Sequence, residues 1–291
     1  VFAVAGTPWL VDIETGSVRE LPAPGPVIDP RLSPDAARVA YVSGGALWVV
    51  DLHDPVPTAV CESDSDEVTW GLADFIAAEE LDRHRGHWWL GADLLVERVD
   101  TSPVAVRWIS DPAQPERAPV AHRYPQAGTD NALVELWRVD PQGTRTQLRW
   151  DSDWFPYLGS VHVDGDRAVL VALSRDQRRA RIMQVVDDRL EVIAEREDEH
   201  WIDMMSGVPR LDDAGRLVEI VADRQTDTYR LVRDGIPLTP VGLQVRALLG
   251  SAADDCVVLA SARPDTAALY RVGPAGVIPL TDPDVLATGA S

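Results

Sequence analysis

Two adjacent glutamates, Glu79 and Glu80, are the residues whose type and position most directly suggest chemistry. They follow Leu72, Phe75 and Ile76, which have the i, i+3, i+4 spacing of one apolar face of a short helix. The glutamates occupy the next two positions of that face, i+7 and i+8, where apolar side chains normally point inward. Because inward-facing carboxylates are costly unless a positive group meets them, we expect a cationic partner or ligand here.

The cation that suits such a pair is an ammonium group. It has three N–H donors and no acceptor, and two carboxylates can accept from it at once through short, charge-assisted bonds. A free peptide amino terminus carries an ammonium, whereas an internal peptide bond does not. A carboxylate pair at a fixed distance from a nucleophile would therefore select chain ends, which is how an exopeptidase sets its register.

The same spacing also allows purely local roles. Glu79 and Arg83 are i, i+4, as are Glu80 and His84, and such surface pairs stabilise a helix by about 0.2–0.5 kcal/mol. His84 and His87 are i, i+3, a spacing that suits a metal, but no third ligand follows at a useful distance. We therefore predict no metal site and no cofactor.

The elements that must position this segment are predicted to be strands. Residues 38–52 indicate a strand, a Ser-Gly-Gly turn and a second strand, and the pattern recurs after residues 91–93, 164–166, 213–215 and 253–255. A unit of roughly 40 to 50 residues with about four short strands is typical of a β-propeller blade. We predict an all-β fold, a β-propeller of about six to eight four-stranded blades that need not be complete. The helix with Glu79-Glu80 would be an insertion that projects toward a central cavity.

Composition narrows the function classes. The chain of 291 residues has a formal net charge of −20, which argues against binding to nucleic acid or to anionic membranes and favours cationic ligands. No apolar run approaches the roughly 20 residues that span a bilayer, and no signal peptide opens the chain. We expect no membrane partner and favour the cytoplasm as the compartment.

Cysteine and tryptophan positions give two structural expectations. Cys61 and Cys256 lie far apart without metal-binding spacing, so we predict two buried free thiols, with one long-range disulfide as the alternative. Trp48, Trp108 and Trp137 fall at strand positions, where we expect them to pack between blades.

Several segments carry a family resemblance. Residues 79–89 are Glu-Glu-Leu-Asp-Arg-His-Arg-Gly-His-Trp-Trp, and residues 124–131 are Tyr-Pro-Gln-Ala-Gly-Thr-Asp-Asn; residues 32–35 and 154–158 fit the same pattern. Together they resemble the N-terminal β-propeller of the dipeptidyl peptidase IV family of serine peptidases, in the prolyl oligopeptidase clan, and most of all its bacterial members. In that family a Glu-Glu pair on a short helix binds the free amino terminus of the substrate. The resemblance thus implies that Glu79 and Glu80 bind substrate.

The resemblance also implies a division of labour. Residues 1–291 would be the non-catalytic N-terminal propeller of a larger peptidase, whose C-terminal α/β-hydrolase domain carries the Ser, Asp and His triad. This chain has no Gly-x-Ser-x-Gly nucleophile elbow, so we expect no catalytic residue in it and no activity from it alone. The complete enzyme would remove dipeptides from peptide amino termini, often after proline or alanine, with the propeller restricting access. Its partners would be such peptides, the hydrolase domain and, in a homodimer, a second copy.

The match is not complete, and two other functions compete with it. Family propellers usually have more chain before the Glu-Glu helix, and an arginine that assists substrate binding in relatives has no assignable counterpart here. One rival is a stand-alone propeller that binds another protein without a peptidase role. The other is a glycan hydrolase, which needs two carboxyl groups about 5 to 9 Å apart across a cleft. Adjacent glutamates on one helical turn are poorly placed for that chemistry.

Overall fold

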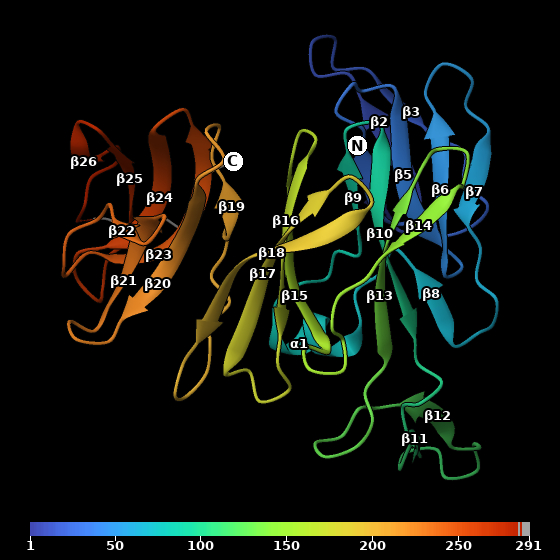
Figure 1. The fold of residues 1–291 in the computed structure, drawn as a ribbon. Coiled ribbons are helices and arrows are strands. Elements are labelled where there is room, and N and C mark those ends of the chain that lie inside the picture. Colours follow the sequence, from blue (N-terminus) through green and yellow to red (C-terminus); the bar gives the residue numbers. More distant parts are fainter. Residues whose placement is uncertain (285, 287–291) are drawn as a thin grey trace. The chain divides into compact units, whose positions relative to one another are not determined.

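The computed structural model describes residues 1–284 and 286. This part of the chain contains 26 strands and a single α-helix, which confirms the all-β class (Figure 1). Within it, no helix has the length and apolar character needed to cross a membrane.

Small antiparallel sheets, most of them built from consecutive strands, make up the fold. The first sheet contains β1 (Phe2–Val4), β2 (Thr7–Val11) and β3 (Val18–Glu20), and the second contains β4 (Ile28–Leu32), β5 (Arg38–Ser43), β6 (Ala46–Asp51) and β7 (Pro57–Cys61). The third sheet contains β8 (Val68–Trp70), β9 (His87–Leu90), β10 (Asp93–Asp100), β13 (Leu133–Val139) and β14 (Arg145–Leu148), and the fourth contains β15 (Tyr157–Asp164), β16 (Arg167–Leu173), β17 (Arg179–Val186) and β18 (Arg189–Glu197). The fifth sheet contains β19 (Arg210–Leu211), β20 (Leu217–Asp223), β21 (Thr228–Arg233) and β22 (Ile236–Pro237), and the sixth contains β23 (Gln244–Ala252), β24 (Asp255–Ser261), β25 (Ala268–Gly273) and β26 (Gly276–Pro279).

These sheets are the blades that the sequence repeat predicts. Four of the six have four strands each, in the described residues, whereas the first has three and the third has five. The predicted turn at Gly44-Gly45 joins β5 to β6, and both glycines have positive φ. The β-propeller prediction is thus confirmed, but its uniform four-stranded blade is not.

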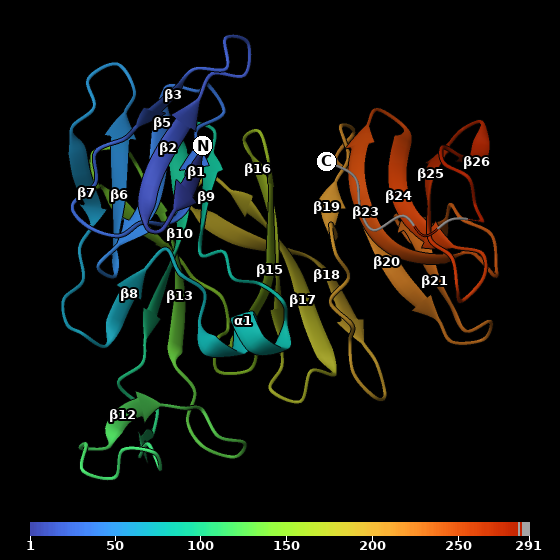
Figure 2. The same ribbon diagram turned by 180° about the vertical axis from the view of Figure 1, so that it is seen from behind.

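The third sheet carries two insertions. Helix α1 (Phe75–Glu80) lies between β8 and β9, and a separate hairpin of β11 (Val106–Ile109) and β12 (Val120–Arg123) lies between β10 and β13. The strand that follows β10 in the chain is therefore part of this hairpin, and β10 pairs with β13 instead. Figures 1 and 2 both show the hairpin extending beyond the ends of β10 and β13.

The chain divides into two compact units. The first comprises Val1–Gly159, Ala172–Gln177 and Val185–Glu191; the second comprises Ser160–Val171, Arg178–Gln184 and the described residues from Val192 on. Helix α1 and the hairpin belong to the first unit.

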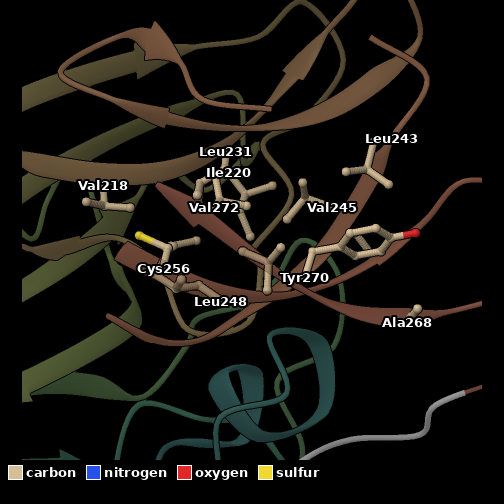
Figure 3. Packing of buried hydrophobic residues seen from close by; sticks show 13 residues of the cluster. Val218, Ile220, Leu231, Leu243, Val245, Leu248, Cys256, Ala268, Tyr270 and Val272 are labelled. Atoms are coloured by element: carbon tan, nitrogen blue, oxygen red, sulfur yellow. The ribbon is translucent and has the colours of Figure 1, made fainter. Parts of the chain in front are cut away.

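Each unit has its own apolar core. In the first, one cluster joins side chains of the second and third sheets, among them Leu47, Trp70 and Leu94. In the second, side chains of β20, β21, β23, β24 and β25 pack around Leu231, Val258 and Cys256. Figure 3 shows this second cluster, with Cys256 and Tyr270 among the side chains that lie together.

The two sequence expectations about packing have different outcomes. Cys61 and Cys256 are buried free thiols, as predicted. Trp48 and Trp137 are partly buried and pack against core clusters that join neighbouring sheets. The prediction for Trp108 is wrong, because it lies in the hairpin, where no second sheet covers it, and is 69% exposed.

Candidate functional site

Helix α1 is short, with six residues from Phe75 to Glu80. Asp74 is its N-cap: the backbone there is extended, and its carboxylate accepts from the backbone N–H groups of Ile76 (3.0 Å) and Ala77 (3.3 Å). A helix of this length is not stable in water on its own, so contacts with the rest of the unit must hold it in place.

The buried face of α1 is not the one that the sequence pattern predicts. Asp74, Ala77 and Leu81 are buried, whereas Glu79 and Glu80 are exposed. The expectation that the glutamates face inward is therefore wrong. The cap sets where the helix starts, and the small side chain of Ala77 lets the helix approach the core closely on that face.

A buried ion pair fixes the chain that follows the helix. Arg83 and Glu97, which are 8% and 0% exposed, form a salt bridge through Arg83 Nη1. Arg83 also donates to the backbone oxygen of Leu158 from Nε (3.2 Å) and Nη2 (2.8 Å) and to that of Arg85 (2.6 Å). The second Glu97 oxygen accepts from the backbone N–H of Asp74 (3.3 Å). One carboxylate from β10 thus holds both ends of α1.

Burial shapes the electrostatics of this anchor. Burial raises the pKa of Glu97 to about 7, and the nearby Arg83 guanidinium works in the opposite direction. Burial likewise raises the pKa of Asp74, again opposed by Arg83. The anchor therefore holds two carboxyl groups that ionise less readily than usual, next to one arginine.

The helix-surface pairs that the spacing allows do not form among the described residues. Arg83 is directed into the core rather than toward Glu79, and His84 is exposed and lies 4.0 Å from Asp82. Within the described residues, the carboxylates of Glu79 and Glu80 have no hydrogen-bond or ion-pair partner. Two adjacent carboxylates that lack an internal cation are free to accept hydrogen bonds from an ammonium group.

An aromatic contact links two of the sequence segments. Phe75 of α1 and Tyr124, which follows β12, pack edge-to-face with ring centroids 5.2 Å apart. Tyr124 begins the Tyr-Pro-Gln-Ala-Gly segment, so the structure brings that segment against the helix. Leu158, the last residue of the matching segment 154–158, accepts hydrogen bonds from Arg83 through its backbone oxygen.

Sequence reasoning missed the anchor itself. It assigned Arg83 to the helix surface and gave no role to Asp74 or Glu97. One signal was present, because Glu97 interrupts the apolar run from Leu94 to Val99, and a charged residue inside a buried strand requires a partner.

The two histidines of this segment do not act together. His84 is exposed, with 74% of its side chain accessible, whereas His87 is fully buried with Nδ1 3.0 Å from the Gly71 oxygen. In residues 1–284 and 286, no group of three or more His, Cys, Asp or Glu side chains is placed to hold a metal ion.

Comparisons with known proteins agree with this architecture. The model of the family described as the dipeptidyl peptidase IV N-terminal region matches residues 2–233. Dipeptidyl peptidase 8 of Mus musculus is 27% identical over 134 residues, which cover 40% of this chain and 15% of that protein. The Homo sapiens dipeptidyl peptidase 8 is 26% identical over 134 residues, with the same shares of the two chains.

The fold comparison covers more of the chain. The crystal structure of Porphyromonas gingivalis dipeptidyl peptidase 4 matches 94% of this chain with a TM-score of 0.78 at 19% identity, a likeness that shows the fold. This chain covers 41% of that structure's chain, so it spans less than half the length of the relatives it matches. Because the family model matches residues 2–233, most of the sequence, the chain belongs to the family of dipeptidyl peptidase IV N-terminal regions.

Proposed function

We propose that this chain is the substrate-selecting propeller of a dipeptidyl-peptidase-like serine exopeptidase. In this proposal Glu79 and Glu80 bind the free amino terminus of a peptide, and the propeller limits access to the catalytic centre. The nucleophile belongs to a C-terminal α/β-hydrolase domain of the same protein, so the native gene product has a mass well above the 31.8 kDa of this chain.

One observation carries the proposal. Glu79 and Glu80 are adjacent, exposed and without an internal cation among the described residues, while the helix that presents them is fixed by the buried Arg83–Glu97 pair. Glu79 and Glu80 are thus available to a ligand, yet held by a rigid base. Rigid placement of a binding group is what register selection requires, because it sets the distance from the bound amino terminus to the cleaved bond.

The test is kinetic and uses the full-length enzyme. Loss of one charge-assisted hydrogen bond in a closed site is worth about 1.5–3 kcal/mol, so Glu79→Gln or Glu80→Gln should lower kcat/KM by roughly 10- to 100-fold for substrates with a free amino terminus. Glu199→Gln removes another exposed carboxylate and should leave kcat/KM unchanged. If both helix variants kept wild-type kcat/KM, the anchoring role would be lost.

A second proposal concerns partners. We propose that the β11–β12 hairpin contacts a second copy of the chain in a homodimer. This small two-stranded sheet exposes several large apolar side chains, namely Val106, Trp108, Ile109 and Val120. Val106 and Trp108 lie on one face of the hairpin, and Ile109 pairs with Val120 on the other. Apolar side chains exposed on both faces favour an interaction surface over a solvated one. The same hairpin would serve the stand-alone interaction propeller, which differs in predicting no effect of the Glu79 and Glu80 variants on binding.

A further inference from the structure

A cavity of about 250 Å³ lies within the second unit, remote in sequence from helix α1. Strands β16, β17, β18, β20 and β21 line it, together with residues 201–205, 208 and 209. Part of its wall is apolar, formed by side chains such as Ile182, Val208 and Ile220, and two flexible methionines, Met204 and Met205, complete that wall.

Two aromatic side chains and one carboxylate meet at this cavity. Trp201 Nε1 donates to Asp203 Oδ1 at 2.8 Å, and the Tyr229 hydroxyl donates to Asp203 Oδ2. Burial and the Asp203 carboxylate raise the pKa of Tyr229 to about 12, so its hydroxyl stays a donor at neutral pH. Because both rings are tied by their polar ends to one carboxylate, they are held next to it.

The charges that line the cavity are unevenly paired. Arg196 donates to Glu219, whose side chain is 7% exposed, with Nε 3.0 Å from Oε1. Arg224 pairs with Asp198 at 2.7 Å. Asp203 receives hydrogen bonds from neutral groups and, among the described residues, has no cationic side chain within 4.0 Å. Arg196 and Arg224 each pair directly with another carboxylate, and Arg224 attracts Asp203 only at longer range. Asp203 can therefore accept a directly bound cation.

We infer that this cavity binds a small organic ammonium compound with apolar substituents on or near its nitrogen. Tryptophan and tyrosine attract such cations through their rings, and a neighbouring carboxylate supplies the opposite charge. The apolar wall provides for the substituents, and the net charge of −20 raises the local concentration of cations. The inference is independent of the proposed exopeptidase role, because neither Glu79 nor Glu80 lines this cavity, which lies within the second unit.

The experiment uses the whole chain and a matched pair of probes. Choline is titrated by isothermal calorimetry and by broadening of its trimethylammonium NMR signal, and 3,3-dimethylbutan-1-ol serves as its neutral isostere. We expect choline to bind and the alcohol to bind at least about threefold more weakly, because the cation–π contribution depends on charge. Trp201→Leu and Asp203→Asn should each weaken choline binding by about three- to tenfold.

Two controls make the result decisive. Glu199→Gln removes an exposed carboxylate close in sequence but outside the cavity, and a Glu79→Gln/Glu80→Gln chain removes the helix pair; both should bind choline as the wild type does. Trp201 and Asp203 are exposed, so their replacement leaves the core intact. Absence of choline binding, equal binding of the alcohol, or loss of binding only in the helix variants would each overturn the inference.

Discussion

At the scale of single residues, the candidate site depends on a buried charge pair that does not touch a ligand. Glu79 and Glu80 present the carboxylates, but Glu97 determines where they stand, because it binds Arg83 beyond the helix and the Asp74 backbone before it. Removing one partner of such a pair leaves an uncompensated buried charge, which is more damaging than the pair itself is stabilising. The exposed glutamates and the buried pair that supports them therefore respond differently to mutation.

The pKa of Glu97 gives a pH prediction. It is raised from an ordinary value of 4.5 to about 7, so the folded chain binds this proton more tightly than the unfolded chain. The contribution of protonated Glu97 to the free energy of unfolding is therefore fully present below pH 4.5 and is lost as the pH rises to about 7. The free energy of unfolding of the native chain, measured by urea denaturation, should therefore fall relative to that of Glu97→Gln across this range. A constant difference between the two proteins from pH 4.5 to 7 would contradict the assignment.

At the scale of elements, α1 is held by its surroundings rather than by its own sequence. The chain returns from the helix through Gly86 and passes so close to Leu72 that a Cβ on Gly86 would lie 2.3 Å from the Leu72 carbonyl carbon. Leu72 and Arg85 form an isolated β-bridge at the same place. The contact between these two stretches of chain, before and after α1, fixes both ends of the loop that carries Glu79 and Glu80.

Gly86→Ala should therefore separate the chain at residue 86 from the backbone of Leu72. The backbone of residue 72 cannot give way as a flexible side chain would, so we expect a destabilisation of about 2–4 kcal/mol, measured as a lower midpoint of thermal or urea unfolding. Gly250→Ala is the matched control, because nothing lies within 4 Å of the Cβ it would add. Equal unfolding midpoints for the two variants would show that this contact is not tight in solution.

The hairpin is the second element with a testable role. Trp108 is 69% exposed, and Trp154, outside the hairpin, is 68% exposed, so the two positions differ in location but not in accessibility. Trp108→Glu should convert a dimer into a monomer in sedimentation equilibrium, because a charge in an apolar contact is costly to bury. Trp154→Glu should leave the dimer intact. A wild-type chain that is monomeric at tens of micromolar would remove the homodimer proposal.

Local patterns predicted the elements well and their contacts less well. The alternation and turns of residues 38–52 indicated β5 and β6 because both depend on neighbouring residues. The existence of α1 was also predicted, but its buried face was not, since that face depends on the cap at Asp74 and on the space available for Ala77. Arg83 was misplaced because its partners, Glu97 and Leu158, lie beyond the reach of an i, i+4 rule. Trp108 shows the same limit, because a strand pattern does not reveal whether another sheet packs over it.

At the scale of the whole molecule, the negative net charge attracts cationic ligands at distances where no single residue contacts them. The formal net charge of −20 creates a field that attracts cations over distances of about a Debye length, roughly 10 Å at 0.1 M salt. Both ligand classes proposed for this chain, peptide amino termini and organic ammonium compounds, carry positive charge. Their encounter with the protein should therefore be faster than that of neutral ligands of similar size.

Salt separates this steering from the local contacts. For a lysine-rich peptide with a free amino terminus, raising NaCl from about 0.05 to 0.5 M should lower the association rate constant by roughly tenfold, because the Debye length then becomes shorter than the approach distance. The dissociation rate constant should change much less, since it reflects the contacts at Glu79 and Glu80, which are made at short range. Stopped-flow anisotropy measures both constants, and a charge-neutral peptide with the same amino terminus is the control. If salt lowered the association rate constants of the two peptides equally, the net charge of the protein would not contribute to association. Recognition would then depend on the contacts at the helix alone.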